Sequence, residues 1–428
     1  MGTELLRLRL EEGALDERFR EIYMTGDAAE VRLRVQHVLD LYDRRFGADT
    51  DSGNVELFSA PGRTELGGNH TDHQRGCVLA ASVSLDLMAA AAPNGTDIVR
   101  LESEGYDMIE TDLSDLSVHP EEKNGTAALV RGIAAAIRQR GFRAGGFNAC
   151  VISDVPGGSG LSSSAAFETL VGVIFNRMFC GEALDAVEIA KIGQYAENTY
   201  FGKPCGLMDQ MACSVGGAIA IDFRNPDEPE ITRIPFSFAE SGYQLCIIDS
   251  GADHADLTED YAAVPEEMKR VAGQLGKEVL REVPEELFLQ NLASLRKTCG
   301  DRAVLRASHF YRENARVQTE TEALLRGDFQ AYLRTAEQSG RSSFMYLQNV
   351  FSPRFPEKQA VAVALMAAER FLEGKGICRV HGGGFAGTIQ AFVPEDMADG
   401  FCRKMETVLG EGCCRLLQIR PYGGIVLT

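Results

Sequence analysis

The spacing of apolar and polar positions divides the first half of the chain into helical and extended segments. Through residues 1–50, Leu and Val recur at three- and four-residue intervals amid dense charge, which predicts helices that lead into the first domain and cover it. Residues 76–92 form a long run rich in Val, Leu and Ala, which predicts a buried strand. Further strands are predicted at residues 55–60, 147–153 and 215–223, and further helices at residues 127–140, 163–180 and 182–200.

A polar, proline-bearing segment at residues 225–229 is typical of a linker and predicts the hinge between two domains. We place these domains at residues 1–228 and 229–428, because a chain of 428 residues usually divides into two cores. The order of the elements predicts an α+β fold rather than a doubly wound sheet. In the second half, strands are predicted at residues 243–250, 387–393 and 415–427, and helices at residues 262–275, 284–297, 308–326, 329–347 and 357–372.

Composition and charge exclude several classes of protein. Apolar residues make up 45% of the chain and charged residues 25%, which is ordinary for a soluble protein. The net charge of −19 argues against a nucleic-acid partner, because the phosphates would need a basic face. The first 20 residues lack the apolar core of a signal peptide, and no run reaches the ~18 apolar residues of a membrane span. We therefore expect a cytoplasmic protein without a membrane partner, and a monomer.

The 11 cysteines are scattered without CxxC pairs and show no Cys/His spacing typical of zinc. Cys413 and Cys414 are adjacent, an arrangement that suits a disulfide poorly. The pattern predicts reduced thiols in a cytosolic protein.

The most informative polar segment is the glycine-rich run at residues 157–166, which lies between a predicted strand and a predicted helix. Glycine lets the backbone approach a ligand closely, and a helix N-terminus offers unpaired N–H groups to an anion. No lysine follows the glycines, so the segment is not a GxxxxGK[ST] loop, and it is not a dinucleotide-binding GxGxxG either. It indicates a phosphate-binding loop of another type, or a flexible linker into the helix.

Three other segments concentrate ligand-binding groups. Residues 382–387 hold four glycines in six positions, which indicates close approach of the backbone to a ligand or a tight turn. Residues 63–73 combine Arg, Glu, Asn, Asp and two His, a set that suits a polyhydroxylated ligand or a polar surface loop. Asp209, within residues 205–210, lies between apolar stretches, so it is either a partly buried carboxylate in need of partners or a helix cap.

Together these segments resemble the motifs of the GHMP sugar and isoprenoid kinases, and among them the galactokinase family, in the same order from about residue 58 to residue 427. The family's Pro-Gly-Arg-Val-Asn-Leu-Ile-Gly-Glu-His-Thr-Asp-Tyr corresponds to residues 61–73, and its Gly-Leu-Ser-Ser-Ser-Ala to residues 160–165. Cys-Gly-Ile-Met-Asp-Gln corresponds to residues 205–210, and the triple-glycine motif to residues 382–387.

The resemblance implies a two-domain GHMP kinase fold with the active site in the inter-domain cleft, and an ATP-dependent sugar 1-kinase that acts on galactose with Mg²⁺. Asp209 would accept or orient the proton of the anomeric hydroxyl, with Arg63 beside it. The sugar would be bound by Asn69, His70, Asp72, Gly206 and Tyr261. The ATP phosphates would be held by Gly157, Gly158, Ser159, Gly160, Leu161, Ser162, Ser163 and Ser164, with Gly382, Gly383 and Gly384 on their other side. Ser164 and Glu197 would hold Mg²⁺.

The departures from the family pattern concern the sugar more than the chemistry. Glu65 stands where the family usually has Asn, Asn69 where it has Glu, and His73 where it has Tyr. An amide adds donors where a carboxylate only accepts, so a sugar altered at C6, such as galacturonate, or lacking C6, such as arabinose, is an alternative. N-acetylgalactosamine is another candidate, and a non-catalytic sugar and ATP sensor is a further class, although intact Arg63 and Asp209 argue against it. The segment at residues 70–72 favours the sugar branch over the isoprenoid kinases.

Overall fold

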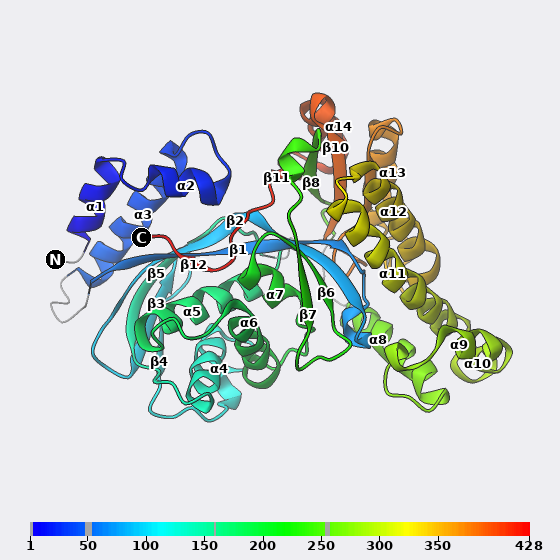
Figure 1. The fold of residues 1–428 in the computed structure, drawn as a ribbon, viewed down its shortest axis with the longest axis horizontal. Coiled ribbons are helices and arrows are strands. Elements are labelled where there is room, and N and C mark those ends of the chain that lie inside the picture. Colours follow the sequence, from blue (N-terminus) through cyan, green and yellow to red (C-terminus); the bar gives the residue numbers. More distant parts are fainter. Residues whose placement is uncertain (1–2, 48–53, 158–159, 253–256) are drawn as a thin grey trace.

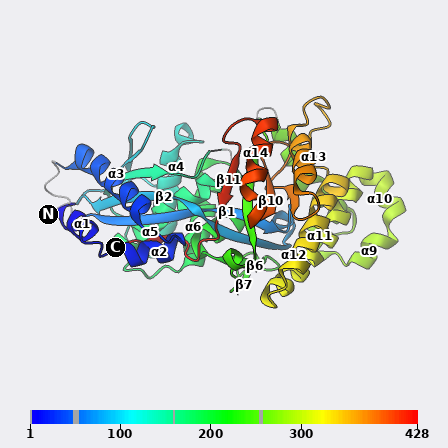
Figure 2. The same ribbon diagram turned by 90° about the horizontal axis from the view of Figure 1, so that it is seen from above.

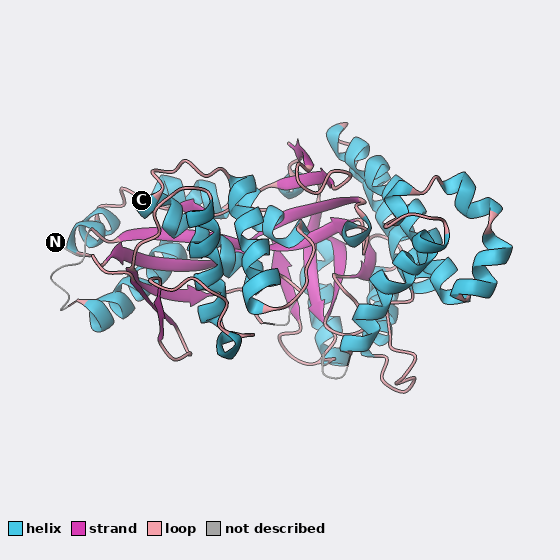
Figure 3. Cartoon of the chain, turned by 90° about the horizontal axis from the view of Figure 1, so that it is seen from below, coloured by secondary structure: helices cyan, strands magenta, loops and turns pink. Residues whose placement is uncertain are grey.

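The computed structural model describes residues 3–47, 54–157, 160–252 and 257–428, and it contains two β-sheets that lie side by side along the long axis (Figure 1). The order of the first sheet is β12-β1-β2-β5-β3-β4, with β6 paired to β2 and β7 to β6. The order of the second is β11-β8-β10-β9, all antiparallel. Helices cover both sheets (Figure 3). The α+β prediction is confirmed.

The central strands of the first sheet, β1, β2 and β5, are buried on both faces. Its strands are β1 (Glu56–Gly67), β2 (Cys77–Pro93), β3 (Ile98–Ser103), β4 (Ile109–Asp112), β5 (Phe147–Ser153), β6 (Ala218–Asp222), β7 (Glu230–Ile234) and β12 (Ile425–Val426). Along β1 and β2 the alternating residues Phe58 and Ala89 enter one core, whereas Leu57 and Met88 enter another. Burial of both faces explains why β2 reads as a continuous apolar run.

The helices of the first sheet divide between its two faces. One face holds α4 (Thr126–Gln139), α5 (Ser163–Phe179), α6 (Ala186–Tyr195), the π-helix η3 (Ala196–Phe201) and α7 (Met208–Val215). The other face is covered by α1 (Glu4–Glu11), α2 (Asp16–Tyr23) and α3 (Ala29–Phe46), as the sequence predicted (Figures 1 and 2). The helices α5 and α7 therefore approach β1 from the side opposite to the N-terminal helices.

One buried carboxylate joins the two ends of the chain to this sheet. Asp86 on β2 accepts hydrogen bonds from Tyr23 on α2 at 2.6 Å and from Arg34 on α3 at 2.6 Å. It also accepts one from Arg420, which lies between β11 and β12, at 3.0 Å. Arg420 and Asp86 are both fully buried, so the two arginines supply the charge that the carboxylate needs.

The second sheet consists of β8 (Tyr243–Asp249), β9 (Ile377–Val380), β10 (Thr388–Pro394) and β11 (Cys414–Leu417). On one face it carries α13 (Ala360–Leu372) and α14 (Ala398–Leu409). Its other face shares a core with the first sheet, since Leu245, Phe392 and Leu417 belong to the same cluster as Phe58. The remaining helices are α8 (Thr258–Gln274), α9 (Glu285–Gln290), α10 (Leu292–Cys299), α11 (Asp301–Leu325) and α12 (Phe329–Ser342), followed by the π-helix η6 (Ser343–Leu347). None of the helices in the described part of the chain is long and apolar enough to cross a membrane.

The predicted hinge at residues 225–229 is wrong, because this segment is the turn of a hairpin between β6 and β7. Strand β7 is mostly exposed, so it lacks the apolar alternation that would have revealed it. The segment predicted as a strand at residues 415–427 divides between the two sheets as β11 and β12. The first sheet thus draws strands from both sides of residue 228, and the domain boundary stays a prediction.

Two further elements differ from their predictions. Strand β1 does not end at Pro61 but continues to Gly67, because a register shift between Pro61 and Arg63 accommodates the proline, which has no N–H to pair. The helix predicted at residues 284–297 is divided into α9 and α10 at Asn291. Short elements missed by the sequence analysis include β3, β4, β7, β9, α7 and α14.

Candidate active site

Arg63 and Asp209 form a bidentate ion pair between β1 and α7. Arg63 Nε donates to Asp209 Oδ1 at 2.7 Å, and Nη2 donates to Oδ2 at 2.8 Å. The Arg63 side chain is 7% exposed and that of Asp209 is 34% exposed, so the carboxylate is accessible from solvent while its partner is not. Two parallel charge-assisted bonds fix the orientation of this carboxylate.

The loop before α5 packs directly against this pair. The backbone N–H of Arg63 donates to Leu161 O at 3.0 Å, Arg63 Nη1 donates to Gly160 O, and Ser162 Oγ donates to Asp209 Oδ2 at 2.5 Å. Ser162 precedes the first residue of α5 and has a φ of +57°, a region that costs a serine energy. The strained serine thereby joins the N-terminus of α5 to the carboxylate.

A group of oxygen ligands lies one turn further along α5. Ser164 Oγ donates to Glu197 Oε1 at 3.4 Å, and the Gln210 amide donates to Glu197 at 2.9 Å and to Glu168 at 3.0 Å. Burial, and then the nearby Glu197, raise the pKa of Glu168 well above its usual range. Glu168 Oε1 and Gln210 Oε1 are buried without a hydrogen-bond partner among the described residues. Ser164 and Glu197 bring a hydroxyl and a carboxylate oxygen together, and hard oxygen donors of this kind fit Mg²⁺.

Sequence reasoning missed Lys203, the cation in this group. Its Nζ lies 3.2 Å from Glu197 Oε1, although most of the lysine side chain is exposed. Lys203 follows the π-helix η3, which carries Glu197, and only the order Lys-Pro-Cys before the Asp209 motif could have drawn attention to it. Glu168 and Gln210 were also missed, because Glu168 lies outside the motifs and Gln210, although it ends the motif at residues 205–210, was given no role.

The triple-glycine loop, residues 382–387, lies against residues 61–73, which are called motif one below. A Cβ on Gly384 would stand 2.0 Å from Asn349 O, and Gly384 has a φ of +76°, so only glycine fits at this position. Tyr261 Oη donates to Gly384 O at 2.7 Å, and the tyrosine ring contacts Phe385 edge-on. The loop is therefore held by α8 on one side and by the residues after β1 on the other.

His70, His73 and Asp72 form one hydrogen-bonded chain that ends on this loop. His70 Nε2 lies 2.9 Å from Gly383 O, and His70 Nδ1 lies 3.1 Å from His73 Nε2. His73 Nδ1 lies 2.9 Å from Asp72 Oδ1. Gly383 O and Asp72 Oδ1, at the two ends of this hydrogen-bonded series, can only accept. All three bonds therefore need three protons on the four ring nitrogens, and one of the two rings must then be cationic.

The pKa shifts of His70 and Asp72 follow from burial and from their contacts with His73. Burial, and then the neighbouring His73, lower the pKa of His70 to about 4, so His70 is neutral. Although burial opposes ionisation, the contact with His73 holds the pKa of Asp72 at about 2.

Asn69 is surrounded by protein groups. Its amide nitrogen donates to Gly382 O at 2.7 Å and to Glu65, and its amide oxygen accepts from Asn349 at 2.9 Å and from Ser343 at 3.2 Å. The residue is 1% exposed. A sugar contact by Asn69 stays a prediction, and it would require at least one of these bonds to break.

Glu65 forms a second ion pair from β1, with Arg379 on β9. Burial raises the pKa of Glu65 to about 7, against the opposing effect of Arg379. Two of the family departures, Glu65 and Asn69, are thus hydrogen-bonded to each other at 3.1 Å. Both residues take part in contacts between motif one and the second sheet.

A cavity of about 390 Å³ opens beside Asp72 and Gly206. A Cβ on Gly206 would stand 1.9 Å from Asp72 Oδ2, so a larger residue there would displace the Asp72 carboxylate. The cavity is also lined by Arg75, Lys269 and Gln194. Its volume suits a monosaccharide, and it contains two of the five predicted sugar contacts.

The structure brings together most of the predicted ATP-side residues. Gly160, Leu161, Ser162, Ser163 and Ser164 lead into or begin α5, and Gly157 precedes them. Gly158 and Ser159 lie outside the described residues. A larger cavity of about 660 Å³, lined by Phe236 and Tyr243 among others, contains none of the predicted site residues.

Comparison with known proteins gives the class. The GHMP kinases N terminal domain family matches residues 128–217, and the galactokinase galactose-binding signature matches residues 40–93. A crystal structure of mevalonate kinase shares the fold at 15% identity, with a TM-score of 0.58 over 85% of this chain and 99% of that chain. The fold and the site define a GHMP kinase.

Galactokinases match more closely over the whole length. The galactokinase of Actinobacillus pleuropneumoniae is 32% identical over 366 residues, 84% of this chain and 90% of the relative, and that of Streptomyces coelicolor is 28% identical over 92% of both. Lactococcus lactis galactokinase complexed with galactose has a TM-score of 0.77 at 25% identity, over 92% of this chain and 99% of that chain. The chain belongs to the galactokinase family, as its motifs predicted.

Proposed function

We propose that the protein transfers the γ-phosphoryl group of ATP to the anomeric hydroxyl of galactose, giving galactose 1-phosphate and ADP. The observation that carries the proposal is the Arg63–Asp209 pair, whose carboxylate is accessible beside the loop that begins α5. The similarity to a galactokinase that binds galactose supports the choice of sugar.

In the proposed reaction the sugar oxygen O1 attacks the γ-phosphorus, and the bond from that phosphorus to the β,γ-bridging oxygen breaks. Asp209 accepts or orients the O1 proton, since its carboxylate is fixed by Arg63 and Ser162. Arg63 stays charged and offsets the negative charge of the transferring group. Phosphoryl transfer depends mainly on such positioning and electrostatics.

The loops on either side supply the remaining interactions. Backbone N–H groups at the N-terminus of α5 bind phosphate oxygens, and the triple-glycine loop lies opposite. Ser164 and Glu197 would hold Mg²⁺, which neutralises phosphate charge when it is bound, and Glu168 and Gln210 have oxygens to support these ligands. Lys203 adds a cation next to Glu197.

On the sugar side, Asp72, Gly206 and His70 are proposed to contact hydroxyl groups, with Tyr261 holding the neighbouring loop. We assign Asn69 a positioning role, because all of its polar side-chain atoms bond to protein groups. A monomer in the cytoplasm stays our expectation.

The test is ADP release from Mg-ATP with galactose, galacturonate, arabinose, N-acetylgalactosamine, glucose and mevalonate. We expect galactose to give the highest kcat/KM. ATP and sugar binding without turnover on any of them would instead support a sensor.

A second candidate substrate is a sugar with a carboxylate at C6. The cavity beside Asp72 is lined by Arg75 and Lys269, and no ion pair is recorded for Lys269 in the described part of the chain, although Arg75 is paired with Glu278 and Glu282. A higher kcat/KM for galacturonate, lost in Lys269→Met, would favour this candidate. Equal behaviour of wild type and Lys269→Met on both sugars would remove it.

A further inference from the structure

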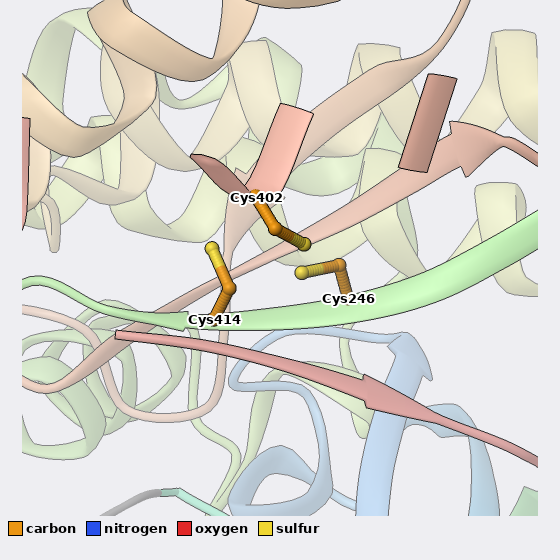
Figure 4. Close-up of side chains that lie close together, drawn as sticks. All are labelled: Cys246, Cys402 and Cys414. Carbon is orange, nitrogen blue, oxygen red and sulfur yellow. The ribbon is translucent and has the colours of Figure 1, made fainter. Parts of the chain in front are cut away.

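Three cysteine thiols converge in the second sheet, away from the proposed active site. Cys246 comes from β8, Cys414 from β11 and Cys402 from α14, and their Sγ atoms all lie within 4.8 Å of one another. Figure 4 shows the sulfurs of Cys402 and Cys246 facing each other, with the Cys414 side chain beside them. All three thiols are free.

The fold brings these thiols to one face of the sheet. Cys246 is opposite Leu416 in the antiparallel pairing, so Cys414, two residues before Leu416, projects to the same face. Helix α14 packs on that face against β10 and β11 and places Cys402 above the two strands. Because the ligands come from three separate elements, no short Cys spacing in the sequence reveals the cluster.

The geometry suits a metal ion bound by sulfur. A Zn–S bond is about 2.3 Å, so two sulfurs in a tetrahedral site are about 3.8 Å apart, and the cluster needs to contract by no more than about 1 Å. Cys246 is fully buried, whereas Cys402 and Cys414 are partly exposed, so an ion can reach the sulfurs from solvent. A fourth sulfur is adjacent, since Cys413 Sγ lies 3.8 Å from Cys414 Sγ.

We propose that Cys246, Cys402 and Cys414 bind one thiophilic d¹⁰ cation, for which Zn(II) is the probe. Thiolates select soft and borderline cations over Mg²⁺ and Ca²⁺, which require oxygen ligands. The ion takes a fourth ligand from Cys413 or from water. Binding releases the thiol protons, so affinity falls as the pH falls.

A bound ion joins parts of the chain that are distant in sequence. It attaches α14 and the edge strand β11 to the central strand β8. Strand β8 leads directly to Ser250, whose Oγ donates to Gly387 O at the end of the triple-glycine loop. The ion therefore stabilises the sheet that carries this loop, and its effect on unfolding follows its occupancy.

The experiment is a competition titration of Zn(II) against a chromogenic chelator, with untagged, fully reduced, metal-free protein. The variants are Cys402→Ser and Cys414→Ser, both at partly exposed positions, and Cys180→Ser is the control at a buried cysteine outside the cluster. We expect one tight site per chain in the wild type and in Cys180→Ser. Each cluster variant should bind at least about 100-fold more weakly, since loss of a residue that merely supports a ligand costs 10–100-fold.

A second readout separates ligation from unfolding. Co(II) bound by thiolates gives a sulfur-to-metal charge-transfer band, and we expect this band in the wild type to weaken in Cys402→Ser, with circular dichroism unchanged. The same Zn(II) affinity in all variants, or no tight site in the wild type, overturns the proposal. It is also overturned if titration of the thiols in protein purified without reductant shows two of the three cysteines joined in a disulfide that reduction does not convert to a Zn(II) site.

Discussion

Strand β1 supplies one partner to each of two ion pairs, and the two pairs differ in what surrounds them. In the Arg63–Asp209 pair the carboxylate is 34% exposed and touches the loop that begins α5. In the Glu65–Arg379 pair the side chains are 3% and 1% exposed and are enclosed by protein groups. The first pair is open to a substrate and the second is not. Arg63 and Glu65, two positions apart on one strand, therefore have different roles: Arg63 belongs to the candidate active site, and Glu65 stabilises the fold.

The largest expected effect is the loss of activity when the Arg63–Asp209 pair is changed. Asp209→Asn keeps the shape of the side chain but removes its negative charge, so we expect kcat to fall by about 10³-fold or more, with a smaller loss of stability than in the Glu65–Arg379 pair because Asp209 is 34% exposed. Asp222→Asn is the matched control, because Asp222 also pairs with an arginine, Arg281, outside the site. Steady-state kinetics with both variants check this, and equal losses in the two would contradict it.

The enclosed Glu65–Arg379 pair should instead contribute to the stability of the folded protein. Arg379→Met leaves Glu65 buried without its partner, and we expect a loss of about 3–5 kcal/mol in the free energy of unfolding. The double variant Glu65→Gln/Arg379→Met should recover much of this loss. Urea denaturation measures both, and a loss below about 1 kcal/mol in the single variant would show that the pair is not structural.

Two further buried carboxylates near the Glu65–Arg379 pair, Glu313 and Glu320, should differ in their contribution to stability. Glu313 accepts from the backbone N–H groups of Gly68 and Asn69 and from Ser339, and although burial opposes ionisation, Arg316 holds the pKa of Glu313 at about 2. Burial raises the pKa of Glu320 well above its usual range, which favours the neutral form of its carboxyl group. We expect Glu313→Gln to cost about 2–3 kcal/mol and Glu320→Gln under about 1 kcal/mol. Equal costs, measured by urea denaturation, would reject this assignment of charge.

The smallest effect is a pH dependence at the boundary between the two sides. The pKa of His70 is lowered to about 4 in the folded chain, against 6.5 as its ordinary value. Above pH 6.5 both states are neutral, but as the pH falls from 6.5 to 4 the unfolded chain binds a proton that the folded chain does not, and stability declines. His70→Gln should flatten this part of the curve of unfolding free energy against pH. A curve unchanged by the substitution would exclude His70 as its source.

The Arg63–Asp209 pair was easier to predict from the sequence than the Glu65–Arg379 pair. Arg63 and Asp209 lie in motifs that resemble those of the galactokinase family, and the resemblance implied a proton acceptor with a cation beside it. The partner of Glu65 lies 314 positions away on β9, a short strand without a clear pattern, so local spacing could not find it. Helix α7, which carries Asp209, was missed because it has only 8 residues and is buried on most sides.

Lys203 and the cysteine cluster show the same limit. Lys203 meets Glu197 because the chain turns back after the π-helix η3, where the backbone N–H of Lys203 donates to Glu197 O, and no periodicity predicts such a turn. Cys246, Cys402 and Cys414 lie on three elements whose order in space depends on sheet pairing. The motifs therefore predicted the residues of the candidate active site, whereas contacts between elements distant in sequence could be found only from the folded structure.

The most direct test of the central claim is to identify the phosphorylated atom of the sugar. Wild type and Asp209→Asn are incubated with Mg-ATP and galactose, and the products are examined by ³¹P NMR with coupling to the sugar protons. We expect a phosphate coupled to the anomeric proton in the wild type and none in the folded variant. Phosphate on another hydroxyl, or the same product at the same rate from Asp209→Asn, would contradict it.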